Sequence, residues 1–236
     1  MRIHFIIHES FEAPGVYYDW AIKKGHDVTT SKLYDGGKLP ENAKNLDFLI
    51  VMGGPQSPRT SLVDCPHFDA QAEIELIRDF IRNNKPVIGV CLGAQLLGEA
   101  FGAKVEKSPE KEIGNFPIKL TQAGFSDKNI SRIGEILTVG HWHGDMPGLT
   151  ESSQVLAKSI GCPRQIVKFS KKHYGFQCHL EFSRELVDAL LAEEENFEQQ
   201  AKINIYVQSA DVIQKYDYRE MNRKLEGFLD AFLGDF

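Results

Sequence analysis

The sequence has no long apolar run and no export signal. In 236 residues no apolar stretch approaches the ~20 residues that a membrane-spanning helix requires. Residues 1–7 form a short strand-like run that His4 interrupts, and they lack the apolar stretch of a signal peptide. These absences predict a cytoplasmic protein with no membrane partner.

Basic clusters and closely spaced cysteines are also missing. The formal net charge is -6, and nucleic-acid binding would need a basic patch or stripe, so we expect no nucleic-acid partner. The four cysteines are far apart and include no C-x-x-C pair: Cys65, Cys91, Cys162 and Cys178. This spacing predicts free thiols in a reducing compartment.

The composition is that of a globular protein, with 42% hydrophobic and 25% charged residues. In the first hundred residues, short apolar runs that end in glycine or polar turns alternate with amphipathic segments. Strands are predicted at 3–7, 47–52 and 86–90, and helices at 13–24 and 68–83. The alternation predicts an α/β fold in which helices cover both faces of a parallel sheet.

The second half has a different pattern. Between about residue 103 and residue 180 we predict successive strands with few helices, at Val105, 118–120, 136–139, 155–157, 166–169 and 174–178. The last fifty residues return to helix, with an apolar stripe formed by Tyr218, Met221, Leu225, Phe228, Leu229 and Phe232. The acidic trio at 193–195 is interpreted as a solvated helix face. We predict a single domain over residues 1–236, with 183–236 a helical extension packed on it.

The segment GVCLGAQLLG, residues 89–98, indicates a nucleophile. A buried strand runs into Cys91 and then directly into an apolar helix. Gly89 and Gly93 permit a sharp strand-to-helix turn that projects the thiol above the sheet. At a helix amino terminus the dipole favours the thiolate. Taken alone, the pattern equally suits a structural cysteine flanked by packing glycines.

The segment HYGFQCHLEF, residues 173–182, supplies a base. It is predicted to be a strand, in which residues two apart share a face. Glu181 can therefore fix the tautomer of His179 and stabilise its charged form, while the other ring nitrogen faces a thiol. Cys178 points to the opposite face.

A glycine turn supplies the electrophilic part of the predicted site. The strand that ends near residue 52 runs into Gly53-Gly54-Pro55. Ligands of parallel sheets bind at the carboxyl ends of the strands, where Cys91 would also lie. The backbone amides of Gly54 and Leu92 can then form an oxyanion hole.

Three segments, MGGPQS, GVCLGAQLLGEAFG and YGFQCHLE, occur in this order over roughly residues 45–182. Together they resemble the landmark segments of class I glutamine amidotransferase domains. The resemblance implies a flavodoxin-like three-layer sandwich with a mostly parallel central sheet. It also implies hydrolysis of the glutamine side-chain amide through a γ-glutamyl thioester, with release of ammonia and no cofactor.

By position, the resemblance implies the roles of five residues. Cys91 matches the nucleophile, His179 the base and Glu181 its orienting group. Gly54 and Leu92 match the oxyanion donors. The usual His-Pro-Glu is here His179-Leu180-Glu181, and Cys178 stands where an aromatic residue is usual. Neither change alters the spacing, so we expect the triad to be retained.

The resemblance also implies pocket residues. Gln95, one helical turn beyond Cys91, matches a glutamine that holds the substrate. HWHGD, residues 141–145, resembles the loop that contacts the amino-acid end of glutamine, which makes Trp142, His143 and Gly144 substrate-binding residues.

Two other kinds of site remain to be weighed. His141 and His143 alternate on a strand face and could chelate a metal, but no carboxylate or cysteine falls at the usual zinc spacings, so we predict no metal site. The elbow cysteine also suits a non-catalytic redox-sensing or binding protein. The pairing of His179 with Glu181 argues against that role, because a sensor thiol needs no base.

The recipient of the ammonia is open. The chain lacks the S-G-G-x-D-S loop of synthetase partners. It is therefore either a glutaminase subunit that needs a synthetase partner or a stand-alone enzyme, monomeric or homodimeric, acting on glutamine or a γ-glutamyl compound. The chain most resembles the stand-alone, GMP-synthase-like branch, some of whose relatives look like γ-glutamyl peptidases. His8 and Glu12 would lie over the same sheet edge, either shaping the acceptor side of the pocket or serving as ordinary polar residues.

Overall fold

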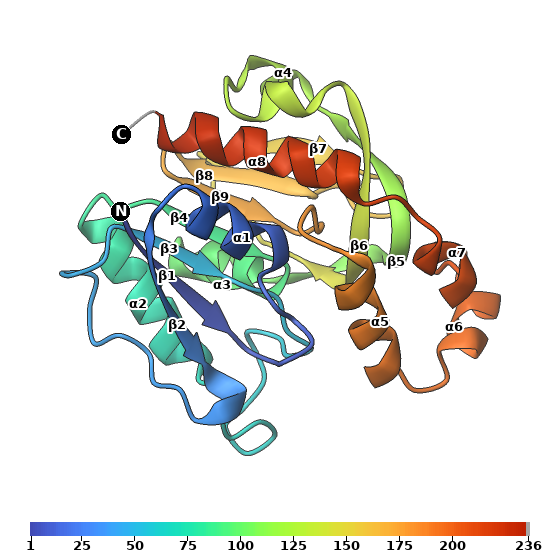
Figure 1. Ribbon diagram of the computed structural model, residues 1–236, viewed down its shortest axis with the longest axis horizontal. Helices are drawn as coiled ribbons and strands as arrows, with labels where there is room; N and C mark the ends of the chain where they lie inside the picture. Colours follow the sequence, from blue (N-terminus) through green and yellow to red (C-terminus); the bar gives the residue numbers. More distant parts are fainter. Residues whose placement is uncertain (235–236) are drawn as a thin grey trace.

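The computed structural model describes residues 1–234, which are built around one nine-stranded sheet (Figure 1). In sheet order the strands are β2 (Asp27–Lys32), β1 (Arg2–Ile7), β3 (Phe48–Val51), β4 (Val87–Val90), β9 (His173–Phe176), β8 (Ile166–Ser170), β7 (Gln154–Lys158), β5 (Glu106–Leu120) and β6 (Ile136–Met146). Neighbours from β2 to β9 pair in parallel, whereas every pairing from β9 to β6 is antiparallel. The sheet is therefore mixed, and its parallel half carries the predicted chemistry.

Helices cover both faces of the sheet, as the sequence predicts. One layer contains α1 (Gly15–Lys23) and α8 (Arg219–Leu233), and the other contains α2 (Ala70–Arg82) and α3 (Leu92–Ala100). In β3, Phe48 and Ile50 join the core on the side of α1 and α8, while Leu49 and Val51 join the core beneath α2 and α3. All four side chains are buried, because successive residues of a strand face opposite sides and both sides are covered.

The remaining elements are short. They are η1 (Leu33–Asp35), α4 (Gln122–Ser126), η2 (Ile130–Ile133), α5 (Arg184–Glu193), α6 (Phe197–Ile203) and α7 (Ala210–Gln214). In Figure 1, α5, α6 and α7 lie together beyond the β5–β6 side of the sheet. Among residues 1–234, no helix has the length and apolar character needed to span a lipid bilayer.

Helix α8 buries its apolar stripe against the chain's own sheet. The ring of Phe228 lies 5.4 Å from that of Tyr174 and 5.0 Å from that of Phe176, both on β9. On the neighbouring helix α1, the indole N–H of Trp20 donates to Asp230 at 2.9 Å. The helical end of the chain is thus part of the main core; the final two residues, 235 and 236, lie outside the described residues.

Some predicted boundaries were wrong for local reasons. Helix α2 begins at Ala70 rather than at residue 68, because the carboxylate of Asp69 accepts hydrogen bonds from the amides of Gln71 and Ala72 and caps the helix. Strand β5 runs continuously from Glu106 to Leu120, whereas the sequence predicted separate strands at Val105 and at 118–120. Its first half is charged and exposed, so it carries little of the apolar pattern by which strands are recognised.

Candidate active site

Cys91 lies on the predicted turn between β4 and α3. Its backbone has φ 51° and ψ -107°, a conformation rare for residues other than glycine. Tight packing maintains the turn: a Cβ on Gly89 would lie 2.2 Å from the carbonyl oxygen of Gly93, and one on Gly93 would lie 2.0 Å from that of Val51. Both glycines are therefore required for the chain to turn here.

His179 and Glu181 face each other, although not on a strand. Strand β9 ends at Phe176, and beyond it His179 pairs only with Gly140 of β6 in an isolated bridge. The prediction of a continuous strand through residue 182 was therefore wrong. Nδ1 of His179 nevertheless donates to Oε1 of Glu181 at 2.6 Å, and the ring of Phe182 stacks on the imidazole at 4.2 Å.

A residue of α8 holds this segment in place. The side-chain amide of Asn222 donates to the backbone carbonyls of Leu180 at 2.8 Å and Phe182 at 3.0 Å. The family's usual proline would restrain the backbone at position 180, and the chain has leucine there. We did not identify Asn222 from the sequence, because nothing near residues 179–181 indicates which distant side chain will bind them.

The electrostatics favour a charged imidazole beside the thiol. Burial lowers the pKa of His179, but the adjacent Glu181 carboxylate and the Cys91 side chain outweigh it, so that this pKa lies well above its usual value. The other ring nitrogen, Nε2, is buried and has no hydrogen-bond partner within residues 1–234. It is left on the Cys91 side, available to exchange a proton.

The other buried thiols lack these features. Cys178 donates to the carbonyl of Gln165 at 3.6 Å, and burial raises its pKa well above the usual thiol value. Burial likewise raises the pKa of Cys162. Sγ of Cys91 accepts from the side-chain amide of Gln177 at 3.4 Å and donates to the carbonyl of Trp142 at 3.7 Å. All four cysteines are free thiols.

The glycine turn after β3 lies against the elbow. A Cβ on Gly53 would come 3.4 Å from Cβ of Cys91, and one on Gly54 would come 2.9 Å from the side chain of Leu92. Within the described part of the chain, the amides of Gly54 and Leu92 donate to no other group, whereas the next amide, that of Gly93, donates to Met52. The two predicted oxyanion donors are thus adjacent and available.

His8 holds this turn from behind. Its Nδ1 lies 2.7 Å from the carbonyl oxygen of Gly53, and its Nε2 lies 2.9 Å from Glu73. Both partners are acceptors, so both ring nitrogens donate and the imidazole is charged. Burial lowers the pKa of His8, but Glu73 outweighs it and the net shift is upward.

Glu12 adds a third buried carboxyl group. Its Oε2 lies 2.5 Å from the position that a Cβ on Gly53 would take. Burial raises the pKa of Glu12 to about 7; the positive charge of His179 opposes this shift and the negative charge of Glu181 reinforces it. The structure therefore places both His8 and Glu12 against the turn at Gly53 and Gly54.

A pocket of about 240 Å³ opens beside Cys91. Six of its lining residues were predicted: Gly54, Cys91, Gln95, Trp142, His143 and Gly144. Gln95 donates to the side chain of Gln177 at 3.2 Å, and its own Oε1 is buried and unpaired. Three predicted site residues are not among those that line this pocket: Leu92, His179 and Glu181. Leu92 directly follows Cys91 in the chain.

Four charged residues of the pocket were not predicted as site residues: Lys107, Lys111, Asp145 and Glu194. The lysines come from the exposed half of β5, whose strand character the sequence hides. Glu194 follows α5 and accepts the indole N–H of Trp142 at 2.9 Å, and that indole stacks on Phe197 at 5.8 Å. The interpretation of residues 193–195 as a merely solvated face was therefore wrong at Glu194.

The histidines of HWHGD meet a carboxylate after all. Oε2 of Glu112, on β5, lies 3.6 Å from Nδ1 of His141 and 3.4 Å from Nε2 of His143. The sequence has no carboxylate at a usual zinc spacing from these histidines, but β5 and β6 pair across the sheet and bring Glu112 to them. The side-chain nitrogen of Gln165 lies among these atoms, at 2.7 Å from Glu112 and 3.1 and 3.2 Å from the two histidines. An amide thus occupies the point where a metal ion would be held.

An elbow nucleophile, a carboxylate-oriented histidine and two adjacent backbone donors are the parts that enzymes of nucleophilic acyl transfer use. Residues 21–197 match the family model described as Glutamine amidotransferase class-I. The chain belongs to the class I glutamine amidotransferase family, and the resemblance seen in its sequence is confirmed.

Similar proteins agree with this assignment. The chain is 50% identical over 230 residues to YfeJ of Salmonella typhimurium, whose name describes it as glutamine amidotransferase-like; the match covers 98% of this chain and 96% of that one. The crystal structure of SMU.1228c has a TM-score of 0.98 at 54% identity, covering 99% and 100%. A glutamine amidotransferase from Methylobacillus flagellatus has a TM-score of 0.85 at 25% identity, covering 99% and 94%. The predicted fold class is confirmed.

Proposed function

We propose that this protein hydrolyses γ-glutamyl amides, either glutamine or a larger γ-glutamyl compound, through a thioester on Cys91. The observation that carries the proposal is the 2.6 Å hydrogen bond between His179 and Glu181, next to a thiol on a strained elbow. Family membership supports amide hydrolysis in general. The proposal adds that the amine released from the substrate can be larger than ammonia.

The reaction follows from the positions of these groups. Nε2 of the charged His179 holds the proton taken from Cys91, and Sγ of Cys91 attacks the δ-carbonyl carbon of the substrate. The carbonyl oxygen becomes an oxyanion between the amides of Gly54 and Leu92. Collapse of this intermediate breaks the carbon–nitrogen bond, and the imidazolium gives its proton to the departing ammonia or amine. Water, deprotonated by His179, then attacks the thioester, and glutamate leaves with the proton again on His179 beside the Cys91 sulfur.

The pocket supports recognition of an amino acid. The unpaired Oε1 of Gln95 can accept a substrate N–H, and the pocket also exposes groups of HWHGD at Trp142, His143 and Gly144. Lys111 offers positive charge for a carboxylate, and Glu194 offers negative charge for an α-amino group, whereas Lys107 is paired with Asp145 at 2.7 Å. A zwitterionic γ-glutamyl group suits this arrangement of charges.

We further propose that the enzyme acts without a synthetase partner and in the cytoplasm, where a thiol nucleophile stays reduced. The contact between His8 and Gly53 supports the first point, because it fixes the oxyanion turn without a second protein. A preorganised donor needs no docking event before reaction.

The test is a screen of the isolated protein with glutamine and a set of γ-glutamyl dipeptides, in which ammonia and released amine are both measured. Cys91→Ser serves as the blank, and Cys178→Ser, which changes an equally buried thiol, serves as the matched control. We expect activity in the wild type and the control and none in the blank. Activity equal to the blank on every compound would reject the stand-alone proposal, and activity restored by an added synthetase would identify a subunit.

A further inference from the structure

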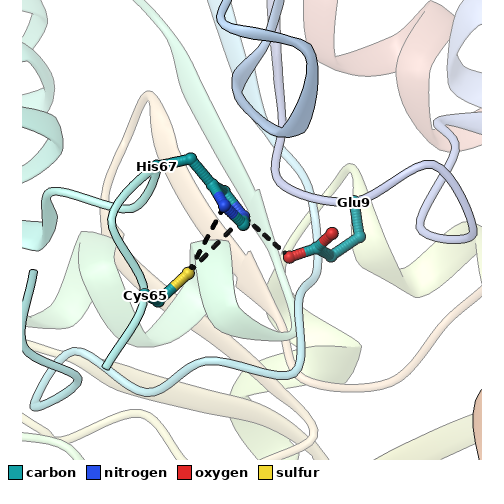
Figure 2. A group of neighbouring side chains, drawn as sticks. All are labelled: Glu9, Cys65 and His67. Atoms are coloured by element: carbon teal, nitrogen blue, oxygen red, sulfur yellow. Dashed lines mark hydrogen bonds and ion pairs between the residues drawn. The ribbon is translucent and has the colours of Figure 1, made fainter. Parts of the chain in front are cut away.

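A second group of chemically active side chains lies at the rim of the pocket. Glu9 comes from the loop after β1, and Cys65 and His67 come from the loop between β3 and α2 (Figure 2). Nε2 of His67 lies 2.8 Å from Oε1 of Glu9 and 3.5 Å from Sγ of Cys65. His67 is exposed and the other two are partly exposed, so the cluster is open to solvent.

The cluster has the residue types of the catalytic triad but not its geometry. A triad needs the carboxylate on one ring nitrogen and the thiol on the other, so that the proton can pass between them. Here Sγ of Cys65 lies 3.5 Å from Nε2 and 3.7 Å from Nδ1 of His67, so the nitrogen that faces Glu9 is also the nearer one to the thiol. The three donor atoms therefore converge on one point, as Figure 2 shows, instead of forming a relay.

We propose that Glu9, Cys65 and His67 form a binding site for a divalent cation of the zinc class. Thiolate, imidazole and carboxylate together are the donors that zinc takes in proteins. With zinc–sulfur and zinc–nitrogen bonds of about 2.3 and 2.0 Å at a tetrahedral angle, the sulfur–nitrogen separation would be about 3.5 Å. The separation between Cys65 and His67 is 3.5 Å. The nitrogen–oxygen separation of 2.8 Å would need to open by about 0.6 Å to match.

The side-chain amide of Gln56 contacts two of the three proposed ligands, Glu9 and Cys65. The amide nitrogen of Gln56 lies 2.6 Å from Oε1 of Glu9 and 3.5 Å from Sγ of Cys65, and so presents N–H hydrogens to the donors that the metal would use. A bound cation would displace this amide. Gln56 also lines the catalytic pocket next to Gly54, so occupancy of the site would alter the pocket's mouth.

The buried group around Glu112 is the weaker candidate. Its two histidines and carboxylate are nearly inaccessible, and the nitrogen of Gln165 occupies the centre with four short contacts, including one of 3.0 Å to Ser159. A cation would have to remove a buried amide to enter. The rim site requires only the movement of a half-exposed side chain.

The experiment is a titration with Co²⁺, a spectroscopic substitute for zinc, of protein that carries Cys91→Ser so that the elbow thiol cannot bind. We expect one equivalent to produce a thiolate-to-cobalt charge-transfer band and tetrahedral visible bands, and Zn²⁺ to abolish both. Adding Cys65→Ser should remove the charge-transfer band. Glu9→Gln should weaken binding by about 10–100-fold, and Gln56→Ala should preserve or tighten it, because it removes the competing amide.

Cys162→Ser and Glu112→Gln, each in the same background, are the matched controls, and neither should change the titration. Zn²⁺ should also raise the unfolding temperature of the Cys91→Ser protein but not that of the double variant with Cys65→Ser. Absence of a charge-transfer band, a band that survives Cys65→Ser, or binding that depends on Glu112 would each overturn the assignment. None of these measurements depends on the enzymatic reaction.

Discussion

Nδ1 of His8 donates to the carbonyl oxygen of Gly53 at 2.7 Å, and this carbonyl belongs to the same planar peptide as the N–H of Gly54. Fixing one end of a planar unit fixes the direction of the other. The buried pair of His8 and Glu73 therefore orients a predicted oxyanion donor, although neither side chain contacts the substrate pocket.

The first prediction is that His8→Gln lowers kcat with little change in KM. The variant loses the charged imidazole that donates to both Gly53 and Glu73, so the Gly53–Gly54 peptide becomes free to rotate. Loss of one oxyanion donor costs about 10²–10³ in rate. We expect a loss of about 10–100-fold, because the peptide still samples the productive direction. The measurement is steady-state kinetics on the best γ-glutamyl substrate.

His4→Gln provides the control for this prediction. His4 lies on β1, four residues before His8, and is also buried, but it contacts Thr29 and Ser31 rather than the glycine turn. Its replacement should leave kcat nearly unchanged once the folded fraction is matched. An equal fall in kcat for both variants would mean that His8 acts only on stability.

The second prediction concerns Glu181→Gln. The glutamine keeps the shape of the carboxylate but removes the charge that helps to raise the pKa of His179. We expect the variant to fold normally and to lose about 10²-fold in kcat, less than the loss of about 10⁴ for the equivalent change in a serine triad, because a thiol and imidazole can already exist as an ion pair.

A change in the pH profile distinguishes this electrostatic role from a structural one. In Glu181→Gln the pKa of His179 should fall, so the histidine loses its proton at lower pH than in the wild type. NMR titration of the His179 ring resonances would measure this directly. Unchanged activity together with an unchanged titration would show that Glu181 only supports the fold.

The parts of the site that the sequence predicted depend on short segments. The geometry of these parts is determined by neighbouring residues: Cys91 lies between Gly89 and Gly93, and His179 lies two residues before Glu181. The elbow could be inferred from the glycine spacing, and the clash that a Cβ on Gly89 would make with Gly93 is local, whereas the clash at Gly93 is with Val51 of β3.

The parts that were missed depend on contacts between distant segments. Glu112 reaches His143 only because β5 and β6 pair in a particular register, in which residue 112 lies opposite residue 143. Asn222 reaches the triad segment only because α8 packs on the sheet. Periodicity predicts that α8 has a buried face, but not which polar residue at its edge will find a carbonyl to bind.

The third prediction is that Phe228→Ala destabilises the protein by about 3–5 kcal/mol, the usual cost of removing a buried phenylalanine. Phe228 is fully buried and packs on Tyr174, Phe176 and Phe232. Chemical denaturation would measure the change. Phe125→Ala is the control, since Phe125 is 46% exposed and its loss should cost much less. A small effect at Phe228 would mean that α8 contributes little to the core.

The fourth prediction concerns Glu12 and the dependence of stability on pH. Burial raises the folded-state pKa of Glu12 to about 7, from 4.5 in the unfolded chain. Between these pH values the folded protein holds a proton that the unfolded chain has released. The contribution of Glu12 to the free energy of unfolding therefore falls as pH rises through this window, by at most about 3 kcal/mol, and changes no further above it.

Glu12→Gln removes this titration while keeping a neutral side chain of the same shape. We expect the variant to match the wild type near pH 4.5 and to exceed it in stability increasingly up to about pH 7. The difference between the two proteins must be used, because burial lowers the pKa of His141 to about 3 and of His173 to about 4, and these buried neutral histidines make stability rise with pH over much of the same range. Denaturation curves at several pH values from about 5 to about 8 give the difference directly. A constant difference across this range would show that Glu12 is already ionised in the folded protein at about pH 5, and that its carboxylate is stabilised by His179.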